Sequence, residues 1–221
     1  MLTLENQGEV LILRMDSGEN RFGNAEIQQW NELLDEALAS EGPKALVTTG
    51  TGKFYSNGLD LDYMQSGEVE PAAYVETALA IMSRILTFPA ITIAAMNGHA
   101  FGAGAQIALA HDYRIMRRDR GYFCMPEIDL GMPLHPGMTA LIQARLPIQT
   151  AHEVIATGTR YSGEMALESR IVDRVEDEAH VLSSAVEMAA GLAAKAAPVM
   201  SRLKAEMYPQ VVEAMASRMT R

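Results

Sequence analysis

The chain of 221 residues has a single cysteine and a single tryptophan, and only 6% of its residues are aromatic. One cysteine excludes an intrachain disulfide and is typical of a protein from a reducing compartment. No apolar run reaches the ~18 residues that a membrane-spanning helix needs, and no N-terminal segment has the pattern of a signal peptide. Residues 219–221 do not form a peroxisomal address. We therefore expect a cytoplasmic protein with no membrane partner.

Positive charge is also scarce, with 18 Lys and Arg against 28 Asp and Glu and a formal net charge of -10. This balance argues against a general nucleic-acid partner, because neutralising phosphates needs clustered Lys and Arg. No cluster of His, Cys and Asp has the spacing of a metal site, so no metal ion is expected. The content of 48% hydrophobic and 21% charged residues is that of a globular protein, and the length suits a single domain.

The hydrophobic pattern predicts strands that alternate with helices, which indicates an α/β fold. Strands are expected at residues 2–4, 10–13, 44–49, 91–96, 113–116 and 171–173. Helices are expected at 25–39 (capped by Asn24), 71–87, 138–144, 148–157, 163–167, 179–194 and 199–216, the last two separated by a break at Pro198. Residues 54–61 read as a loop that contains a glycine.

The stretch from Ala94 to Leu134 contains the two features that point to chemistry. In the first, a strand ends at the turn dipeptide Asn97-Gly98, and the small residues 102–105 lead directly into a helix. A glycine turn before a helix start directs backbone N–H groups at a negative charge. Tight packing of a helix on a strand is the alternative interpretation of these glycines.

The second feature is Glu127, which follows Pro126 in an apolar setting formed by Phe123, Met125, Ile128 and Leu130. Burial raises the pKa of a carboxyl group toward the range that suits a general base. The alternative is a surface or ion-paired glutamate, which is the commoner state of a lone Glu. Donors for an oxyanion together with one buried base are the minimum that enolate chemistry requires.

Four segments carry a more specific signal: 56–61 (SNGLDL), 97–104 (NGHAFGAG), 112–116 (DYRIM) and 126–131 (PEIDLG). Together they resemble the crotonase (enoyl-CoA hydratase/isomerase) superfamily over roughly residues 8 to 195. The runs at 111–113, 117–121 and 127–129 are most similar to the Δ3,Δ2-enoyl-CoA isomerase branch. The resemblance implies a ββα superhelix, with a crotonase-like core at 1–195 and a helical C-terminal part at 196–221 that is short for the family. It also implies a homotrimer or a dimer of trimers.

The resemblance further implies an acyl-CoA substrate, a coenzyme A thioester, with no additional cofactor. By matching motifs, the backbone N–H groups of Leu59 and Ala103 would form the oxyanion hole and Glu127 would be the catalytic base. The residues implied to bind the substrate or its coenzyme A part are Asn57, Gly58, Asp60, Leu61, Gly102 and Gln106, of which Asp60 matches a position that is mainly structural.

Gln106 stands where hydratases of this family carry a second glutamate. Glutamine forms hydrogen bonds but does not accept and deliver a proton at neutral pH. The expected reaction is therefore a shift of the double bond of an enoyl-CoA from C3 to C2 by one Glu base. Two alternatives stay open: hydration of a 2-enoyl-CoA, with Asp or bound water replacing the second Glu, and non-catalytic binding of acyl-CoA.

Other polar residues are interpreted as structural. Histidines beside Gly, Asp or Pro more often pack or form turns than catalyse, and His99, His111 and His135 have no triad-like context, although His135 is expected near the acyl pocket. Cys124 reads as a small buried hydrophobe.

Two further groups have a possible part in the substrate site. Arg21 lies beside a position where some family members contact phosphates, yet an exposed Arg is the commoner case. Four residues could line an acyl tunnel or fill the core: Met64, Met82, Met132 and Leu134.

Overall fold

A computed structural model describes residues 1–218 of the chain. Its main sheet has the strand order β1-β2-β4-β7-β9-β11. The strands are β1 (Leu2–Gln7), β2 (Val10–Met15), β4 (Ala45–Gly50), β7 (Ile91–Met96), β9 (Tyr113–Arg117) and β11 (Arg174–Glu176). β1 and β2 form an antiparallel hairpin, and the other neighbours pair in parallel. The central strands β4 and β7 are buried along almost their whole length, which explains why they carry no charged residue.

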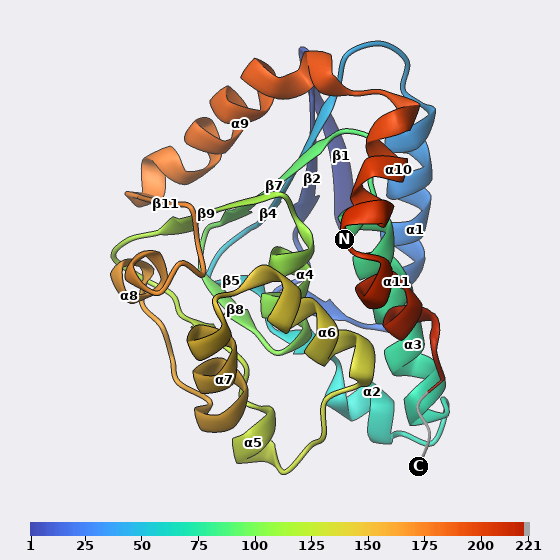
Figure 1. Cartoon of the computed structure of the whole chain (residues 1–221), viewed down its shortest axis with the longest axis vertical. Coiled ribbons are helices and arrows are strands. Elements are labelled where there is room, and N and C mark those ends of the chain that lie inside the picture. Colours follow the sequence, from blue (N-terminus) through green and yellow to red (C-terminus); the bar gives the residue numbers. More distant parts are fainter. Residues whose placement is uncertain (219–221) are drawn as a thin grey trace.

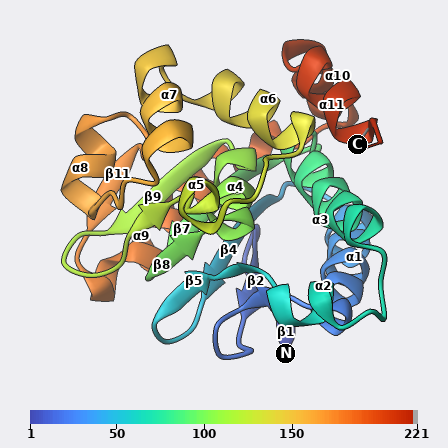
Figure 2. The same ribbon diagram turned by 90° about the horizontal axis from the view of Figure 1, so that it is seen from below.

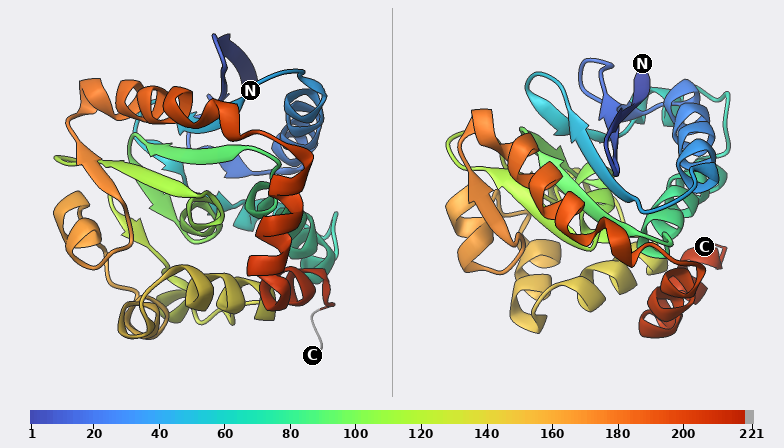
Figure 3. Two further views of the ribbon diagram at one scale, coloured as in Figure 1. Left: turned by 45° about the horizontal axis from the view of Figure 1, so that its top comes forward. Right: turned by 90° about the horizontal axis from the view of Figure 1, so that it is seen from above.

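Helices cover the two faces of this sheet (Figures 1 and 3). On one face, α9 (Val181–Leu192) packs on β4 and β7 through Val181, Ala185 and Ala189. The other face carries the larger core, which includes the buried sides of α1 (Asn24–Ala39), α3 (Pro71–Leu86) and α4 (Ala103–Ala110). Because α4 is buried at all eight of its positions, it lies in the interior of the protein.

Short strands follow the long ones and form two smaller sheets (Figure 2). β5 (Phe54–Ser56), β8 (His99–Phe101) and β10 (Phe123–Cys124) form a parallel sheet in the order β10-β8-β5. β3 (Arg21–Phe22) pairs in parallel with β6 (Gly58–Leu59). Each of β4, β7 and β9 is thus followed by a short strand and then by a helix, so the ββα repeat that the resemblance implied is confirmed.

The remaining helices lie at the periphery, most of them in the lower half of Figure 1. They are α2 (Leu61–Gln65), α5 (Glu127–Leu130), α6 (Pro136–Arg145), α7 (Ile148–Thr157), α8 (Gly163–Glu168), α10 (Pro198–Met207) and α11 (Pro209–Ala216), with 3-10 turns at Glu178–His180 and Ala193–Lys195. The tail folds back on its own chain: α11 packs on α3 and α6, and a Cβ added at Gly137 would lie 2.7 Å from the Cα of Met215. None of the helices within residues 1–218 is long and apolar enough to cross a membrane.

Several predicted boundaries are wrong. Residues 54–61 are not a loop, since they contain β5, β6 and the start of α2. Residues 171–173 are not a strand: Ile171 donates its N–H to the carbonyl of Ala166 after α8, and β11 begins at Arg174. The tail does break directly before Pro198: residues 196–197 separate the 3-10 turn at Ala193–Lys195 from α10, whose first residue is Pro198, a position where proline is tolerated. The predicted helix at 199–216 is two helices, because a second break comes before Pro209. The N-cap of α1 is Gly23 rather than Asn24, and it makes no side-chain cap bond.

Candidate active site

Glu127 is the first residue of the one-turn helix α5, directly after Pro126. Strand β10, which precedes it, pairs with β8, and α4 follows β8 in the chain, so the repeat brings Glu127 beside the start of α4. Its Oε1 accepts a hydrogen bond from Nε2 of Gln106 at 3.4 Å, and a Cβ added at Gly102 would lie 3.5 Å from the same oxygen. Oε2 is buried and has no hydrogen-bond partner among the described residues.

Burial raises the pKa of the Glu127 carboxyl above its ordinary value, and hydrogen bonds from its own backbone and from Gln106 oppose this shift. The apolar setting expected from the sequence is present only in part. Phe123 and Met125 are buried, whereas Ile128 and Leu130 are more than half exposed. The carboxyl group is therefore desolvated by the core beneath it and by the pocket wall, not by a closed apolar shell.

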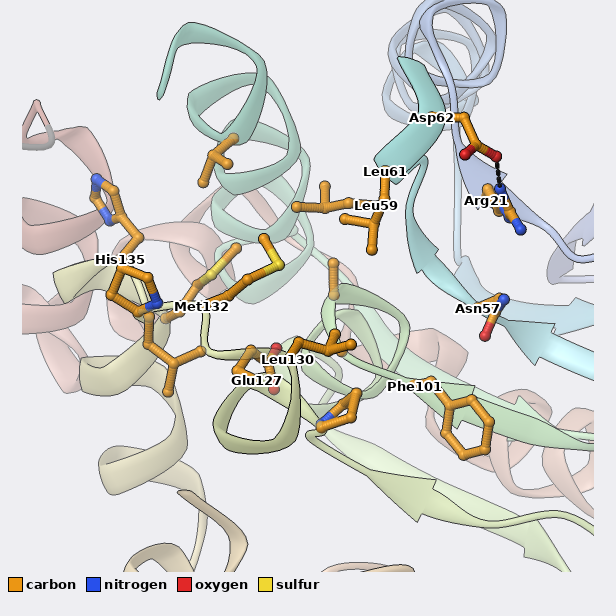
Figure 4. A pocket seen from close by; sticks show the side chains of 17 residues that line it. Arg21, Asn57, Leu59, Leu61, Asp62, Phe101, Glu127, Leu130, Met132 and His135 are labelled. Carbon is orange, nitrogen blue, oxygen red and sulfur yellow. Dashed lines mark hydrogen bonds and ion pairs between the residues drawn. The ribbon is translucent and has the colours of Figure 1, made fainter. Parts of the chain in front are cut away.

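A pocket of about 330 Å³ brings the predicted groups together. Glu127, Leu59 and Ala103 all line it, as do Asn57, Leu61 and Gly102. In Figure 4, Arg21 and Asp62 lie at one end of this pocket and His135 at the other, with Glu127 between them. The wall is mainly apolar and also includes Val75, Phe101, Leu130, Met132, Leu134 and Met138. Such a shape suits a long, mostly apolar ligand with a few polar anchors.

The backbone around Leu59 and Ala103 is held by close contacts of glycine. Gly58 has φ +84°, and a Cβ on it would lie 2.6 Å from the carbonyl oxygen of Phe101 and 3.0 Å from the amide nitrogen of Ala103. Only glycine permits this approach. Ala103 is the first residue of α4, where an amide has no acceptor inside the helix. The close approach at Gly58 therefore brings the backbone next to Leu59 close to the start of α4, and both Leu59 and Ala103 line the pocket.

Gln106 does not line the pocket but lies behind Glu127. Its side chain is fully buried in α4 and donates to the carboxylate, while its own Oε1 has no partner among the described residues. Gln106, which is expected from the resemblance to bind the substrate, is therefore separated from the pocket by Glu127. In the residues that the structure describes, the polar side chain paired with Glu127 is a neutral amide.

Gly58 and Asp60 also lie outside the pocket wall. The carboxylate of Asp60 caps α2 by accepting from the N–H of Tyr63 at 3.3 Å, and it accepts from Arg21 at 3.3 Å. Asn57, which does line the pocket, donates from Nδ2 to Glu19 at 2.9 Å. This part of the site is a network of acidic side chains and their partners.

The sequence favours an exposed surface position for Arg21, but the residue belongs to the pocket wall. Its guanidinium is ion-paired with Glu19 at 2.8 Å, Asp62 at 3.0 Å and Asp60 at 3.3 Å. Three carboxylates around one cation leave little positive charge for a ligand phosphate. The side chain is 36% exposed, so water also screens it. Arg21 therefore orders the loop around 57–62 more than it supplies charge to the pocket.

Of the four residues considered for the acyl tunnel, two line the pocket and two belong to the core or pack against it. Met132 and Leu134 line the pocket, whereas Met82 is fully buried in the core and Met64 packs against it. Sequence reasoning missed Val75 and Met138, which complete the same wall. Their apolar character was visible in the sequence, but it does not separate a pocket wall from a core.

The histidines have different roles. His99 lies among the rings of Phe54, Phe101 and Tyr122. His111 is fully buried between Oγ1 of Thr48 and the carbonyl of Ile107, and burial lowers its pKa to about 3. Both are therefore packing residues, as expected.

His135 forms part of the pocket wall, in agreement with its expected place near the acyl chain. Cys124 is buried, and burial raises the pKa of its thiol to about 11, which makes it a poor nucleophile. Within residues 1–218, no group of three or more His, Cys, Asp and Glu side chains is arranged to hold a metal ion.

Comparisons with known proteins show which family this chain is similar to. Residues 5–220 match the family model described as enoyl-CoA hydratase/isomerase. Enoyl-CoA delta isomerase 2, peroxisomal, of Arabidopsis thaliana is 35% identical over 224 residues, which cover 96% of this chain and 93% of the relative. Carnitinyl-CoA dehydratase of Salmonella agona is 35% identical over 212 residues, 94% of this chain and 79% of the relative.

Solved structures give the same fold. A probable enoyl-CoA hydratase from Mycobacterium tuberculosis superposes with a TM-score of 0.89 at 25% identity, covering 97% of this chain and 91% of that one. Human mitochondrial delta3-delta2-enoyl-CoA isomerase superposes with a TM-score of 0.87 at 21% identity, over 96% of this chain and 84% of that one. The resemblance predicted from four short segments is confirmed, and the chain belongs to the enoyl-CoA hydratase/isomerase family.

Proposed function

We propose that the protein is an enoyl-CoA isomerase, which shifts the double bond of an enoyl-CoA from C3 to C2. One observation carries the proposal: Glu127, whose pKa is raised by burial, lines the same pocket as Leu59 and Ala103, and its polar neighbour is the neutral amide of Gln106. The likeness to plant proteins named enoyl-CoA delta isomerases, at about 35% identity, supports it.

The first step needs an acceptor for negative charge. The thioester oxygen accepts hydrogen bonds from the N–H groups of Leu59 and Ala103, which stabilise the enolate more than the neutral carbonyl. The carboxylate of Glu127 removes a proton from C2, and the electron pair of that C–H bond moves into the dienolate. The protonated Glu127 then returns the proton to C4. The double bond ends between C2 and C3, and the carboxylate is restored.

Gln106 gives the two oxygens of Glu127 different tasks. Its Nε2 can only donate, so the oxygen that faces it, Oε1, stays an acceptor in both protonation states. The proton is then carried by Oε2, which has no protein partner among residues 1–218. A single oxygen can thus take the proton from C2 and deliver it to C4. A second carboxyl at position 106, which hydration would use to hold water, is replaced by an amide.

The remaining predicted residues have supporting parts in this proposal. Asn57, Leu61 and Gly102 contact the acyl-CoA directly, because they line the pocket. Gly58, Asp60 and Gln106 act indirectly, by positioning the backbone, the loop and the base. The coenzyme A thioester is the substrate, and the residues of the site require no other cofactor.

The wider organisation follows from the family. We propose that residues 1–195 form the catalytic core and 196–221 the tail, and that the protein assembles as a homotrimer or a dimer of trimers in the cytoplasm. Sedimentation equilibrium of the purified chain tests the assembly, and a monomer at micromolar concentration contradicts it. One Arabidopsis relative is named as peroxisomal, so imaging of the tagged chain in its own cell tests the compartment.

The test of the reaction compares turnover of 3-hexenoyl-CoA with turnover of crotonyl-CoA. We expect the first to be converted to 2-hexenoyl-CoA and the second to gain water slowly or not at all. Rapid hydration of crotonyl-CoA without isomerisation would make the protein a hydratase, the activity class nearest to the Salmonella relative named a dehydratase. Binding of both ligands with turnover of neither, in the wild type and in Glu127→Gln alike, would indicate a non-catalytic acyl-CoA-binding protein.

A further inference from the structure

Four rings form a continuous surface on the small sheet β10-β8-β5. Ala100 in the middle of β8 is fully buried, so its neighbours His99 and Phe101 point to the opposite face of that sheet. The ring centroid of His99 lies 5.4 Å from that of Phe54 and 5.0 Å from that of Phe101. The ring of Tyr122, which is 40% exposed, lies 5.6 Å from the same imidazole. We call these four residues, 54, 99, 101 and 122, the aromatic face.

Three exposed cations border the aromatic face. Nζ of Lys53 lies 5.2 Å from the ring centre of Phe54. Cζ of Arg160 lies 6.0 Å from the ring centre of Phe101. The third cation, Arg120, belongs to the loop directly before β10, and the charges of all three add to burial in lowering the pKa of the imidazole in the aromatic face. None of the three has an ion-pair partner within residues 1–218.

Two carboxylates lie within reach of these charges, and both are engaged with other partners. Asp119 accepts two hydrogen bonds from Arg117, at 2.7 and 2.9 Å. Glu19 accepts from Nε of Arg21 at 2.8 Å and from Nδ2 of Asn57 at 2.9 Å. In a protein with a net charge of -10, the three cations are therefore a local positive region that remains available to an anion.

The aromatic face is continuous with the pocket. Phe101 belongs to both, and in Figure 4 it lies with Asn57 on the side of the pocket away from His135. A ligand whose acyl part occupies the apolar end therefore leaves the pocket beside Phe101 or beside Arg21. Arg21 is surrounded by three carboxylates, so its side of the opening carries net negative charge and disfavours a phosphate.

We propose that the aromatic face binds the nucleotide end of the coenzyme A thioester, with its phosphates held by Lys53, Arg120 and Arg160. The inference deepens the proposed function, on which it rests, since it names where the anionic end of the substrate is recognised. Guanidinium and ammonium groups form charge-assisted hydrogen bonds with phosphate oxygens, and a nucleotide base stacks on an aromatic ring. Tyr122, the most exposed of the four rings, offers such a platform for the adenine.

Unreactive ligands separate this inference from catalysis. Hexanoyl-CoA has no double bond to move, and hexanoyl-pantetheine carries the same thioester without the nucleotide and its phosphates. Calorimetry measures the affinity of each ligand, and the ratio of the two affinities reports what the nucleotide end contributes. We expect the wild-type ratio to favour hexanoyl-CoA and to fall as salt is added, because exposed charges are screened.

The decisive variants each remove one cation: Lys53→Gln, Arg120→Gln and Arg160→Gln. We expect each to lower the affinity ratio about 5-fold, the upper range for an exposed ion pair, and the triple variant to lower it about 10²-fold. Arg160→Lys, which keeps the charge, should retain part of the ratio. Lys195→Gln is the matched control, since Lys195 is an exposed cation outside the pocket with no ion-pair partner in the described part of the chain. It should leave the ratio at its wild-type value.

Each outcome bears on the inference. An equal ratio in wild type and in the triple variant overturns it, and so does a ratio that falls as far in Lys195→Gln. A ratio that falls in Arg21→Gln but in none of the three cation variants would put the phosphates on the other side of the opening, which also overturns it. These results leave the proposed function standing if the wild type isomerises 3-hexenoyl-CoA.

Failure of both ligands to bind the wild type would instead reject the proposed function together with this inference. If only hexanoyl-pantetheine binds too weakly to measure, the affinity of hexanoyl-CoA in the cation variants and in Lys195→Gln decides the question. The side chains of all three cations are exposed, so their replacement leaves the buried core unchanged.

Discussion

Replacing Gln106 with glutamate puts a second carboxyl group beside the proposed base. In the wild type, the amide nitrogen of Gln106 lies 3.4 Å from Oε1 of Glu127, and Gln106 is fully buried. Two unit charges at that distance repel by about 5 kcal/mol when the effective dielectric constant is about 20. The two carboxyls in Gln106→Glu therefore cannot both be ionised at neutral pH, and they share one proton.

The variant's stability should depend on pH in a defined direction. The native pair holds its proton more tightly than the unfolded chain does, so its folded pKa is raised. Below the carboxyl pKa of the unfolded chain, the variant therefore loses no free energy of unfolding to this pair. Relative to wild type, its free energy of unfolding falls as the pH rises through the raised pKa of the folded pair. We expect the two proteins to have similar free energies of unfolding at pH 4 and the variant to be weaker by up to about 5 kcal/mol at alkaline pH.

Its chemistry should change as well. A protonated pair lowers the fraction of free base at neutral pH, so the isomerase rate should rise toward higher pH than in wild type. Two carboxyls can also hold and activate a water molecule, so hydration of crotonyl-CoA should appear or increase. The pH–rate profiles for 3-hexenoyl-CoA and crotonyl-CoA, with urea unfolding at each pH, measure both effects.

Gln143→Glu on the exposed side of α6 is the charge-matched control, and it should leave both profiles unchanged. The reasoning is refuted if Gln106→Glu gives the wild-type pH–rate profile and a stability difference that is the same at pH 4 and pH 9. That result would mean that residue 106 and Glu127 do not interact in solution.

Three further changes test other parts of the site. Glu127→Gln should lower kcat by about 10²–10⁴-fold in the isomerase assay. The same change should raise the free energy of unfolding at pH 8 but not at pH 4, because burial raises the pKa of this carboxyl and so disfavours its ionised form. Ala103→Pro removes one amide N–H at a helix position that accepts proline, so kcat/KM should fall about 10²–10³-fold with little change in melting temperature; a wild-type rate would remove Ala103 from the oxyanion hole. Lys204→Met breaks the buried ion pair of Lys204 with Asp112 at 2.6 Å and should lower the free energy of unfolding by about 3–5 kcal/mol, with a single transition in urea. Two transitions would show instead that the tail unfolds separately.

Local signals in the sequence predicted the central part of the fold well. The strand at 91–96 has the predicted bounds, and the helix expected after the glycine turn is present, although it already begins at Ala103, within the small residues. Glycine turns and apolar runs report backbone conformation within a few residues, so they can be read without tertiary context. The role of Glu127 needed more, because a lone glutamate is usually exposed, and only the four matching segments placed it at the pocket.

Long-range contacts account for what could not be predicted. β6 has two residues and exists because it pairs with β3, and Arg21 on β3 meets Asp60 and Asp62 about forty positions later in the chain. Lys204 pairs with Asp112 across 92 positions. Nothing within either local segment indicates its partner, which is why the sequence favours an exposed Arg21 and gives no signal for the pair of Lys204.

The glycines of this site show why a structural and a functional interpretation need not compete. A Cβ on Gly104 would lie 2.2 Å from the carbonyl oxygen of Ser56, and one on Gly58 would lie 2.6 Å from that of Phe101. Close packing of α4 on the short strands is therefore real, and it is also what brings the amides of Leu59 and Ala103 to one pocket. A substitution at Gly58 or Gly104 would disturb packing and catalysis together. Only a change that deletes an N–H group and spares the packing, such as proline at position 103, separates the two.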